Sequence, residues 1–203
     1  MSSTPRPPVV AVLAGGRGTR LGGRKATVPL AGRPLLHHPL ESASRAGLEA
    51  VVVAKRETQL PELPVPVIYD RDTTVHPLSG VLAALAEHEA VIAVAGDMPF
   101  VPPALLRRLA DHQEQAVVTR PGSFLQPFPA LYRARAQRSL YTSLMSETSL
   151  QEALERLGPR VIEEGELLAY GLETEIFMSV NTQDDLLTAE RWIAQRRQLT
   201  GAG

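Results

Sequence analysis

The residues best suited to chemistry lie near the start of the chain, where an apolar run ends in a basic loop rich in glycine. Val9 to Leu13 is apolar, and the loop from there to Lys25 contains five glycines, three arginines and a lysine. A short apolar run bounded by turn residues is typical of a buried parallel strand. Glycine lets backbone N–H groups approach a ligand closely, and clustered cations suit a ligand with several negative charges. The pattern is typical of a phosphate-binding loop, but a solvated basic turn explains it about equally well.

The spacing within this loop differs from two well-known phosphate-binding motifs. A P-loop requires a lysine and then serine or threonine after its second glycine, whereas Gly18 is followed by Thr19 and Arg20. The dinucleotide-binding fingerprint requires a third glycine where Leu21 stands. ATPase and dehydrogenase functions are therefore disfavoured.

Asp97 follows a second buried-strand pattern, the apolar run 91–95. Ligands of open α/β sheets bind beyond the carboxyl ends of the strands, so we expect Asp97 at the same edge as the first loop. A carboxylate approaches a triphosphate favourably when a divalent cation lies between them, and Mg²⁺ prefers one or two carboxylates together with phosphate oxygens. We therefore predict that Asp97 is a magnesium ligand; the alternative is a turn-capping aspartate before Pro99.

The rest of the sequence indicates the elements that position these residues, because short apolar runs alternate with segments of helical periodicity. We expect strands at 9–13, 50–54, 66–69, 91–95, 116–119 and 128–132. We expect helices at 34–46, 78–88, 102–111 and 182–199, with a capping box at 149–152 opening another. This alternation predicts an α/β fold with three layers, in which helices cover both faces of a Rossmann-like, mainly parallel sheet.

Length and composition limit the remaining possibilities. The chain has 203 residues, 44% of them hydrophobic, which suits a single domain over 1–203 with disordered ends at 1–8 and 200–203. A net charge of −1 argues against a nucleic-acid partner. No apolar stretch reaches the roughly 18 residues of a membrane span. Cysteine is absent, which excludes thiolate metal sites and is compatible with the cytoplasmic location that we expect.

The first loop, followed by P-L-A-G-R-P-L-L-H-H at 29–38, resembles the opening of the nucleotidyltransferase superfamily. Three later segments agree in order and spacing: V-I-Y-D ending at Asp70, V-A-G-D-M-P containing Asp97, and S-V-N-T-Q-D-D-L containing Asn181. Within the superfamily, the sequence is most similar to the molybdenum cofactor guanylyltransferases over about residues 9–192. The resemblance implies a fold like that of nucleotide-diphospho-sugar transferases. It also implies Mg²⁺-dependent transfer of GMP from GTP to a molybdopterin-type phosphate, with release of pyrophosphate.

The loop chemistry and the resemblance together assign roles to particular residues. We expect Arg20, Lys25 and Asp97 to be catalytic, and Asp97 and Asn181 to be the metal ligands. From the residues alone, Asn181 is nearly as well explained as a helix cap or an Asx turn. The expected nucleotide-binding residues are Leu13, Ala14, Gly15, Gly16, Gly18, Lys25, Asp70, Gly80 and Asp97.

Three positions depart from the pattern of that family. The segment 22–25 is one residue short and lacks the aspartate that usually precedes the lysine; Val53 replaces an asparagine, and His76 replaces a small residue. These departures lie in the expected nucleotide site and therefore bear on base preference. They leave open a related transferase that uses another nucleotide or acceptor, such as a cytidylyltransferase or a sugar-1-phosphate nucleotidyltransferase. They also leave open a catalytically degenerate nucleotide-binding protein.

Overall fold

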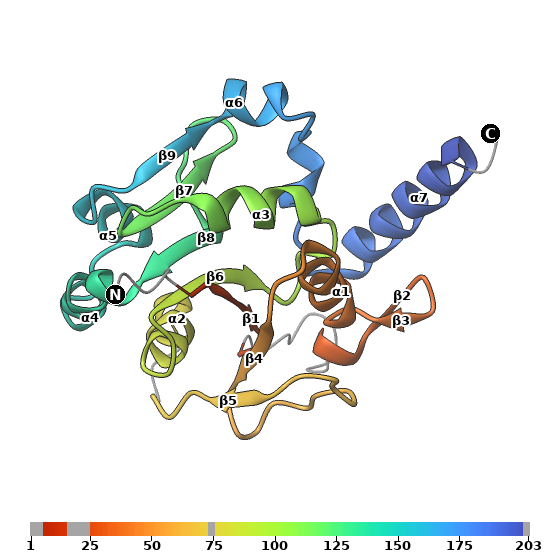
Figure 1. The fold of residues 1–203 in the computed structure, drawn as a ribbon. Coiled ribbons are helices and arrows are strands. Elements are labelled where there is room, and N and C mark those ends of the chain that lie inside the picture. Colours follow the sequence, from red (N-terminus) through yellow and green to blue (C-terminus); the bar gives the residue numbers. More distant parts are fainter. Residues whose placement is uncertain (1–5, 16–24, 73–75, 201–203) are drawn as a thin grey trace.

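The computed structural model describes residues 6–15, 25–72 and 76–200, which form a central sheet surrounded by helices (Figure 1). The elements are, in order, β1 (Val9–Leu13), η2 (Lys25–Thr27), β2 (Pro29–Leu30), β3 (Arg33–Pro34), α1 (His37–Ala46), β4 (Ala50–Ala54), β5 (Val67–Tyr69), α2 (Pro77–Leu85), β6 (Ala90–Ala95), α3 (Pro103–Asp111), β7 (Ala116–Arg120), β8 (Gln126–Arg133), η3 (Ala134–Ala136), α4 (Gln137–Met145), α5 (Leu150–Arg156), β9 (Arg160–Glu163), α6 (Glu164–Ala169), η4 (Thr174–Phe177) and α7 (Gln183–Thr200).

The central sheet has seven strands in the order β5-β4-β1-β6-β8-β7-β9. All neighbouring strands pair in parallel except where β8 lies antiparallel to both β6 and β7. The prediction of a mainly parallel α/β sheet is therefore confirmed.

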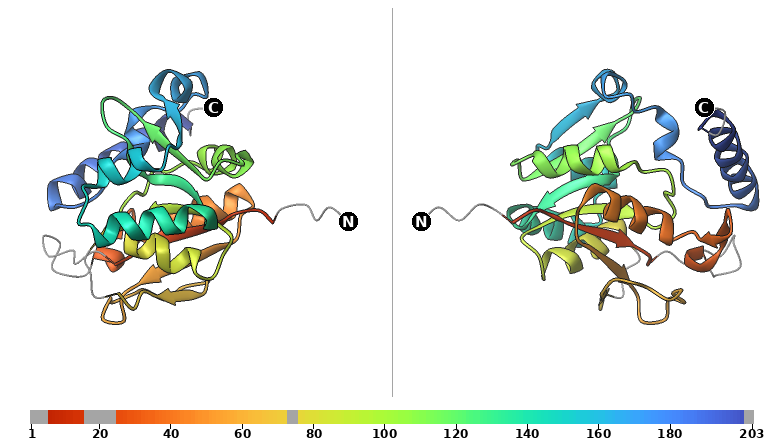
Figure 2. Two further views of the ribbon diagram at one scale, coloured as in Figure 1. Left: turned by 90° about the vertical axis from the view of Figure 1, so that its left-hand side faces the viewer. Right: turned by 45° about the vertical axis from the view of Figure 1, so that its right-hand side comes forward.

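Both faces of the sheet are buried, because alternate strand residues enter two different cores. In β1, Val9 and Ala11 belong to one core, whereas Val10 and Val12 belong to the other. Residues of α2, α4 and α5 complete the first core, and residues of α1, α3 and α6 complete the second. Continuous apolar strands are expected when helices cover a parallel sheet on both sides. Figures 1 and 2 show the resulting three layers.

The register of the strands brings their carboxyl ends to one edge. Leu13 lies opposite both Val53 and Ala95, the last or near-last residues of β4 and β6. Backbone hydrogen bonds continue this alignment into the loops, from Ala14 N to Val53 O at 2.7 Å and from Gly96 N to Leu13 O at 2.9 Å. The loops after β1, β4 and β6 therefore begin side by side.

Two parts of the chain differ from the sequence-based expectation. The helix expected at 34–46 begins at His37, because β2 and β3 form a hairpin that takes up Pro34. The two residues between these strands, Ala31 and Gly32, have φ of 50° and 82°, as a type I′ turn requires. Strand β9 and helices α4 and α6 were not predicted.

Gly96 lies where β6 approaches its neighbours closely. A Cβ there would lie 2.8 Å from Leu36 Cδ1 and 3.1 Å from the backbone oxygen of Leu13. An added methyl group would force the neighbouring atoms of the packed core to shift. We therefore expect Gly96→Ala to lower the free energy of unfolding by about 1–3 kcal/mol in urea titrations. Gly165→Ala is a matched control, since its Cβ would have no neighbour within 4 Å. Equal stability of the two variants would contradict the tight contact.

The last part of the chain packs outside the three layers. Val180, Leu186 and Ala189 form a small core with Leu30 and Leu35 of the hairpin region. The rest of α7 extends away from the sheet in both Figures 1 and 2. Among the described residues, no helix has the length and apolar character that crossing a membrane requires.

Candidate functional site

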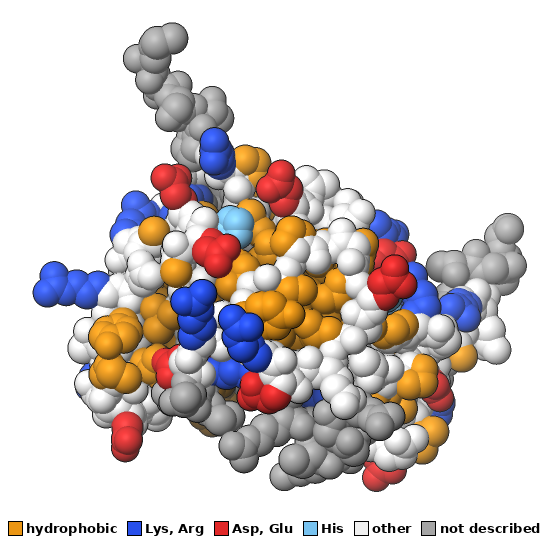
Figure 3. All heavy atoms as spheres, turned by 90° about the horizontal axis from the view of Figure 1, so that it is seen from below, with side chains coloured by type: hydrophobic (Ala, Val, Ile, Leu, Met, Phe, Trp, Pro, Cys, Tyr) orange, Lys and Arg blue, Asp and Glu red, His pale blue; other side chains and the backbone are white. Residues whose placement is uncertain are grey.

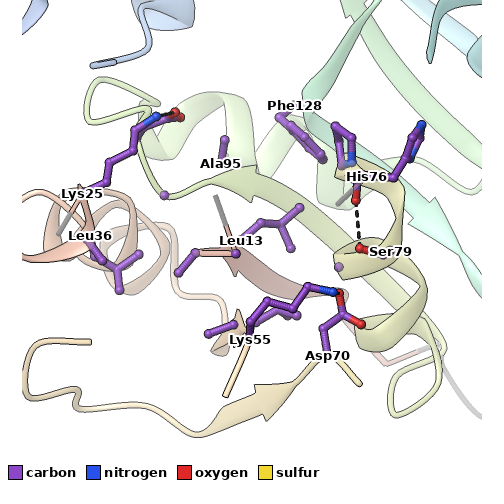
Figure 4. Close-up of a pocket in the computed structure, with 18 residues that line it drawn as sticks. Leu13, Lys25, Leu36, Lys55, Asp70, His76, Ser79, Ala95 and Phe128 are labelled. Atoms are coloured by element: carbon purple, nitrogen blue, oxygen red, sulfur yellow. Dashed lines mark hydrogen bonds and ion pairs between the residues drawn. The ribbon is translucent and has the colours of Figure 1, made fainter. Parts of the chain in front are cut away.

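A cavity of about 260 Å³ opens at the carboxyl edge of the sheet, between β1, β4, β6 and the start of α2 (Figure 4). Most of the predicted nucleotide-binding residues line this cavity: Leu13, Ala14, Gly15, Lys25, Asp70, Gly80 and Asp97. Three predicted residues, Gly16, Gly18 and Arg20, lie outside the described residues.

Lys25 and Asp97 line one end of the cavity, and Lys25 also contacts Asn181, which lies outside the lining, although the three residues are far apart in sequence. The ammonium of Lys25 pairs with Asp97 Oδ2 and donates a hydrogen bond to Asn181 Oδ1 at 2.5 Å. Lys25 opens η2, directly after the undescribed part of the first loop, and Asp97 follows β6. The end of the loop and the end of β6 therefore face a shared cavity, as we expected from the sequence.

Asp97 has the surroundings of a metal ligand. Its Oδ1 atom is buried and has no hydrogen-bond partner among the described residues. An unsatisfied carboxylate oxygen in a protein interior is unfavourable unless a ligand completes it. No group of three His, Cys, Asp or Glu side chains gathers within the described part of the chain. One carboxylate with an amide oxygen nearby leaves most positions to substrate and water, which suits Mg²⁺ better than a metal held wholly by protein.

Asn181 is held in place by the start of α7. Its backbone N–H donates to Asp185 Oδ2 at 2.9 Å, and the N–H of Thr182 donates to the same oxygen at 2.8 Å. Thr182 Oγ1 in turn accepts from Asp185 N at 3.2 Å, which completes a capping box. The hydrogen bond from Asn181, followed by those from Thr182, holds the pKa of Asp185 below its usual value. Thr182 therefore caps the helix, and the Asn181 side chain is directed to Lys25.

A family model and several curated relatives match this chain. The model of the MobA-like NTP transferase domain covers residues 10–161. The chain belongs to this family. A probable molybdenum cofactor guanylyltransferase from Thermococcus kodakarensis is 33% identical over 186 residues, covering 87% of this chain and 90% of that protein. A molybdenum cofactor guanylyltransferase from Rhizobium johnstonii is 30% identical over 202 residues, covering 92% of this chain and 93% of that protein.

Solved structures agree with the membership in the MobA-like family. The molybdopterin-guanine dinucleotide biosynthesis protein A from Archaeoglobus fulgidus is 29% identical, with a TM-score of 0.80 over 92% of this chain and 99% of that one. A 2-C-methyl-D-erythritol 4-phosphate cytidylyltransferase from Thermus thermophilus, 18% identical, has a TM-score of 0.67 over 91% of this chain and 98% of that one, which shows the shared fold. The predicted family, fold and enzyme class are confirmed: the chain is a nucleotidyltransferase, a class whose members are generally metal-dependent.

The second lysine of this MobA-like chain, Lys55, also lines the cavity, and its place there was not predicted from the sequence. Lys55 Nζ lies 2.7 Å from Asp70 Oδ2 and also donates to the backbone oxygen of Asp72. The two paired side chains are 14% and 7% exposed, so this ion pair is largely shielded from water. Figure 4 shows Lys55 and Asp70 on the opposite side of Leu13 from Lys25. The sequence does place Lys55 at the carboxyl end of a strand, because Lys55 directly follows the strand pattern at 50–54.

The departures Val53 and His76 occupy one wall of the cavity. His76 caps α2, since its Nδ1 accepts from Leu78 N at 3.1 Å. Burial lowers the pKa of His76, so its ring stays neutral near pH 7. Gly80 allows α2 to approach the sheet, because a Cβ there would lie 3.2 Å from Leu13 Cδ2 and 3.7 Å from Val53 Cγ1. Leu13 and Val53 are therefore closely packed around Gly80 in this wall.

A second hollow lies next to Asp70. It measures about 510 Å³, its lining includes Arg56, Tyr69 and Tyr141, and it shares Asp70 and Ser79 with the first cavity. The guanidinium of Arg56 lies 5.5 Å from the centre of the Tyr69 ring. Figure 3 shows the molecule from the side of β5, where hydrophobic side chains gather centrally among charged ones. Asp70 and Ser79 therefore form the wall between the two hollows.

Proposed function

We propose that this chain transfers GMP from GTP to the phosphate of a molybdopterin-type acceptor, with Mg²⁺ as its metal ion and pyrophosphate as the leaving group. The observation that carries the proposal is that Lys25, which lines one end of the cavity together with Asp97, contacts both Asp97 and Asn181. The names of the curated relatives support guanine as the base and a molybdenum cofactor as the product.

The cavity suggests how the nucleotide lies. Lys25 and the predicted loop residues Gly16, Gly18 and Arg20 would hold the triphosphate, with Asp97 and Asn181 as ligands of Mg²⁺. Backbone groups of Leu13, Ala14 and Gly15 would line the path of the nucleotide, as their place along the cavity supports. The nucleoside would then extend toward Asp70 and Gly80, on the side of Leu13 away from Lys25.

The residues at the Lys25 end suit the transfer step. The acceptor phosphate is already an anion near neutral pH, so a strong general base is unnecessary. The obstacle is the approach of anions and the charge that develops on the leaving pyrophosphate, and preorganised positive charge lowers both barriers. Lys25 would supply one such charge and would hold the phosphates in line. Bound Mg²⁺ would neutralise further phosphate charge.

A transferase for another nucleotide remains the second candidate. The observation that favours it is the position of His76 and Val53, both of which line the cavity on the side of the expected nucleoside. These are the positions where the chain departs from the guanylyltransferase pattern.

Binding and turnover separate these candidates. We expect Mg²⁺ with GTP to raise the melting temperature of the protein more than Mg²⁺ with ATP, CTP or UTP does. Pyrophosphate release should then depend on both GTP and molybdopterin. A larger shift with CTP would favour the second candidate. Binding of a triphosphate, with no release of pyrophosphate from it in the presence of any acceptor tried, would contradict an enzymatic role.

A further inference from the structure

We infer that Lys25 is an internal counter-ion whose ammonium competes with the divalent cation for Asp97 and Asn181 until a phosphate draws it away. The inference deepens the proposed function and rests on it for the identity of the ligand. It concerns a property of the protein alone, namely its affinity for metal in the absence of nucleotide.

The position of the ammonium carries the inference. Lys25 Nζ contacts Asp97 Oδ2 and Asn181 Oδ1, the carboxylate and the amide that we propose as metal ligands. The segments that carry these two oxygens are joined by a backbone hydrogen bond. Val180 N donates to the backbone oxygen of Asp97 at 2.9 Å. Two oxygens held around one cation describe a site for a cation, and Lys25 is the cation that this structure places there.

The charges make the competition strong. The side chains of Lys25 and Asp97 are each 17% exposed, so water screens their interaction only in part. Asp97 supplies the one carboxylate that contacts Lys25 among the described residues, and Asp185 at the start of α7 interacts with the same ammonium electrostatically, so Lys25 offsets much of the negative charge here. A divalent cation arriving beside Lys25 would meet a carboxylate already paired with an ammonium and a like charge a few ångströms away, and like charges at that distance repel appreciably.

A triphosphate removes this obstacle. Lysine carries its charge on a flexible four-carbon chain, so its ammonium can move to a phosphate oxygen while its backbone stays in place. Each phosphate that attracts Lys25 frees Asp97 for the metal, and each metal ion that binds Asp97 frees Lys25 for the phosphates. Metal and nucleotide therefore favour one another's binding, and by linkage the effect is equal in both directions.

The test is the affinity of the full chain for Mn²⁺ alone, measured by electron paramagnetic resonance of the unbound ion without nucleotide or acceptor. We expect Lys25→Met to bind Mn²⁺ at least about tenfold more tightly than the unaltered protein, because the competing charge is gone. Lys25→Arg keeps the charge and should stay near the unaltered value. Arg160→Met, which removes a cation paired with Glu166 elsewhere in the fold, should leave the affinity unchanged.

Two outcomes would overturn the inference. One is a Mn²⁺ affinity of Lys25→Met that is equal to or weaker than that of the unaltered protein. The other is tighter binding that persists when Asp97→Asn is added to Lys25→Met, since the ion would then lie elsewhere. Melting temperatures measured in a metal chelator check that the proteins compared are folded. Lys25→Gln is a second variant without the charge, in case Lys25→Met does not fold. Because nucleotide is absent, a tighter Mn²⁺ affinity would stand even if GMP transfer were not found.

Discussion

Asp97→Asn is expected to reduce turnover by about 10³-fold or more while the protein stays folded. The amide lacks the negative charge that holds a divalent cation, whereas its size and shape are nearly those of the carboxylate. The backbone oxygen of Asp97, which accepts from Val180 N, is unaffected by the change. Steady-state release of pyrophosphate at saturating magnesium measures the loss, and thermal unfolding measures whether the fold is kept.

Asp111→Asn is the matched control for this experiment. Asp111 is an exposed aspartate at the end of α3, so its replacement removes the same charge away from the cavity. Its turnover should equal that of the unaltered protein. If Asp97→Asn retained magnesium-dependent turnover close to that of Asp111→Asn, Asp97 would have no part in the mechanism.

Lys25→Met is expected to weaken the binding of a magnesium–triphosphate by about 100-fold, or about 2.7 kcal/mol. The substitution removes a charged donor from a partly buried end of the cavity but keeps most of the side-chain volume. Calorimetry with a non-hydrolysable GTP analogue and magnesium measures the affinity. The expected sign is opposite to that for Mn²⁺ alone, so one variant provides two independent readings.

Lys25→Arg serves as the control, because it keeps the charge and should bind the analogue more tightly than Lys25→Met. An unchanged affinity in Lys25→Met would show that this end of the cavity does not hold the phosphates. A loss of affinity for GDP as large as that for the triphosphate analogue would place Lys25 nearer the inner phosphates than the γ-phosphate.

The sequence predicted the parts of the fold that depend on local pattern. The strands 9–13 and 50–54 were located correctly, because apolar runs bounded by turns are sufficient to define buried parallel strands. Asp97 was assigned to the carboxyl edge for the same reason, since the rule for open α/β sheets needs only the end of a strand. The meeting of Lys25 with Asp97 follows from these two locations.

Features that depend on pairing between distant segments were not predictable. Nothing in the run at 128–132 indicates that β8 lies antiparallel between β6 and β7. The pairing of Lys55 with Asp70 depends on β5 lying beside β4 with Ala54 opposite Tyr69, a register that no local pattern reveals. The hairpin at Ala31–Gly32 was missed because its alanine is an unusual residue at positive φ.

The small core that joins α7 to the hairpin has a consequence for how activity is lost on heating. This core, to which the segment contributes Val180, Leu186 and Ala189, contains far fewer buried side chains than either core of the sheet. Regions with few buried contacts detach at lower free energy than the body of a domain. Detachment of this segment would carry Asn181 away from Lys25 while the sheet persisted. Activity should therefore be lost at a lower temperature than that of global unfolding. A substrate that contacts both Lys25 and Asn181 should reduce the difference between the inactivation temperature and the melting temperature.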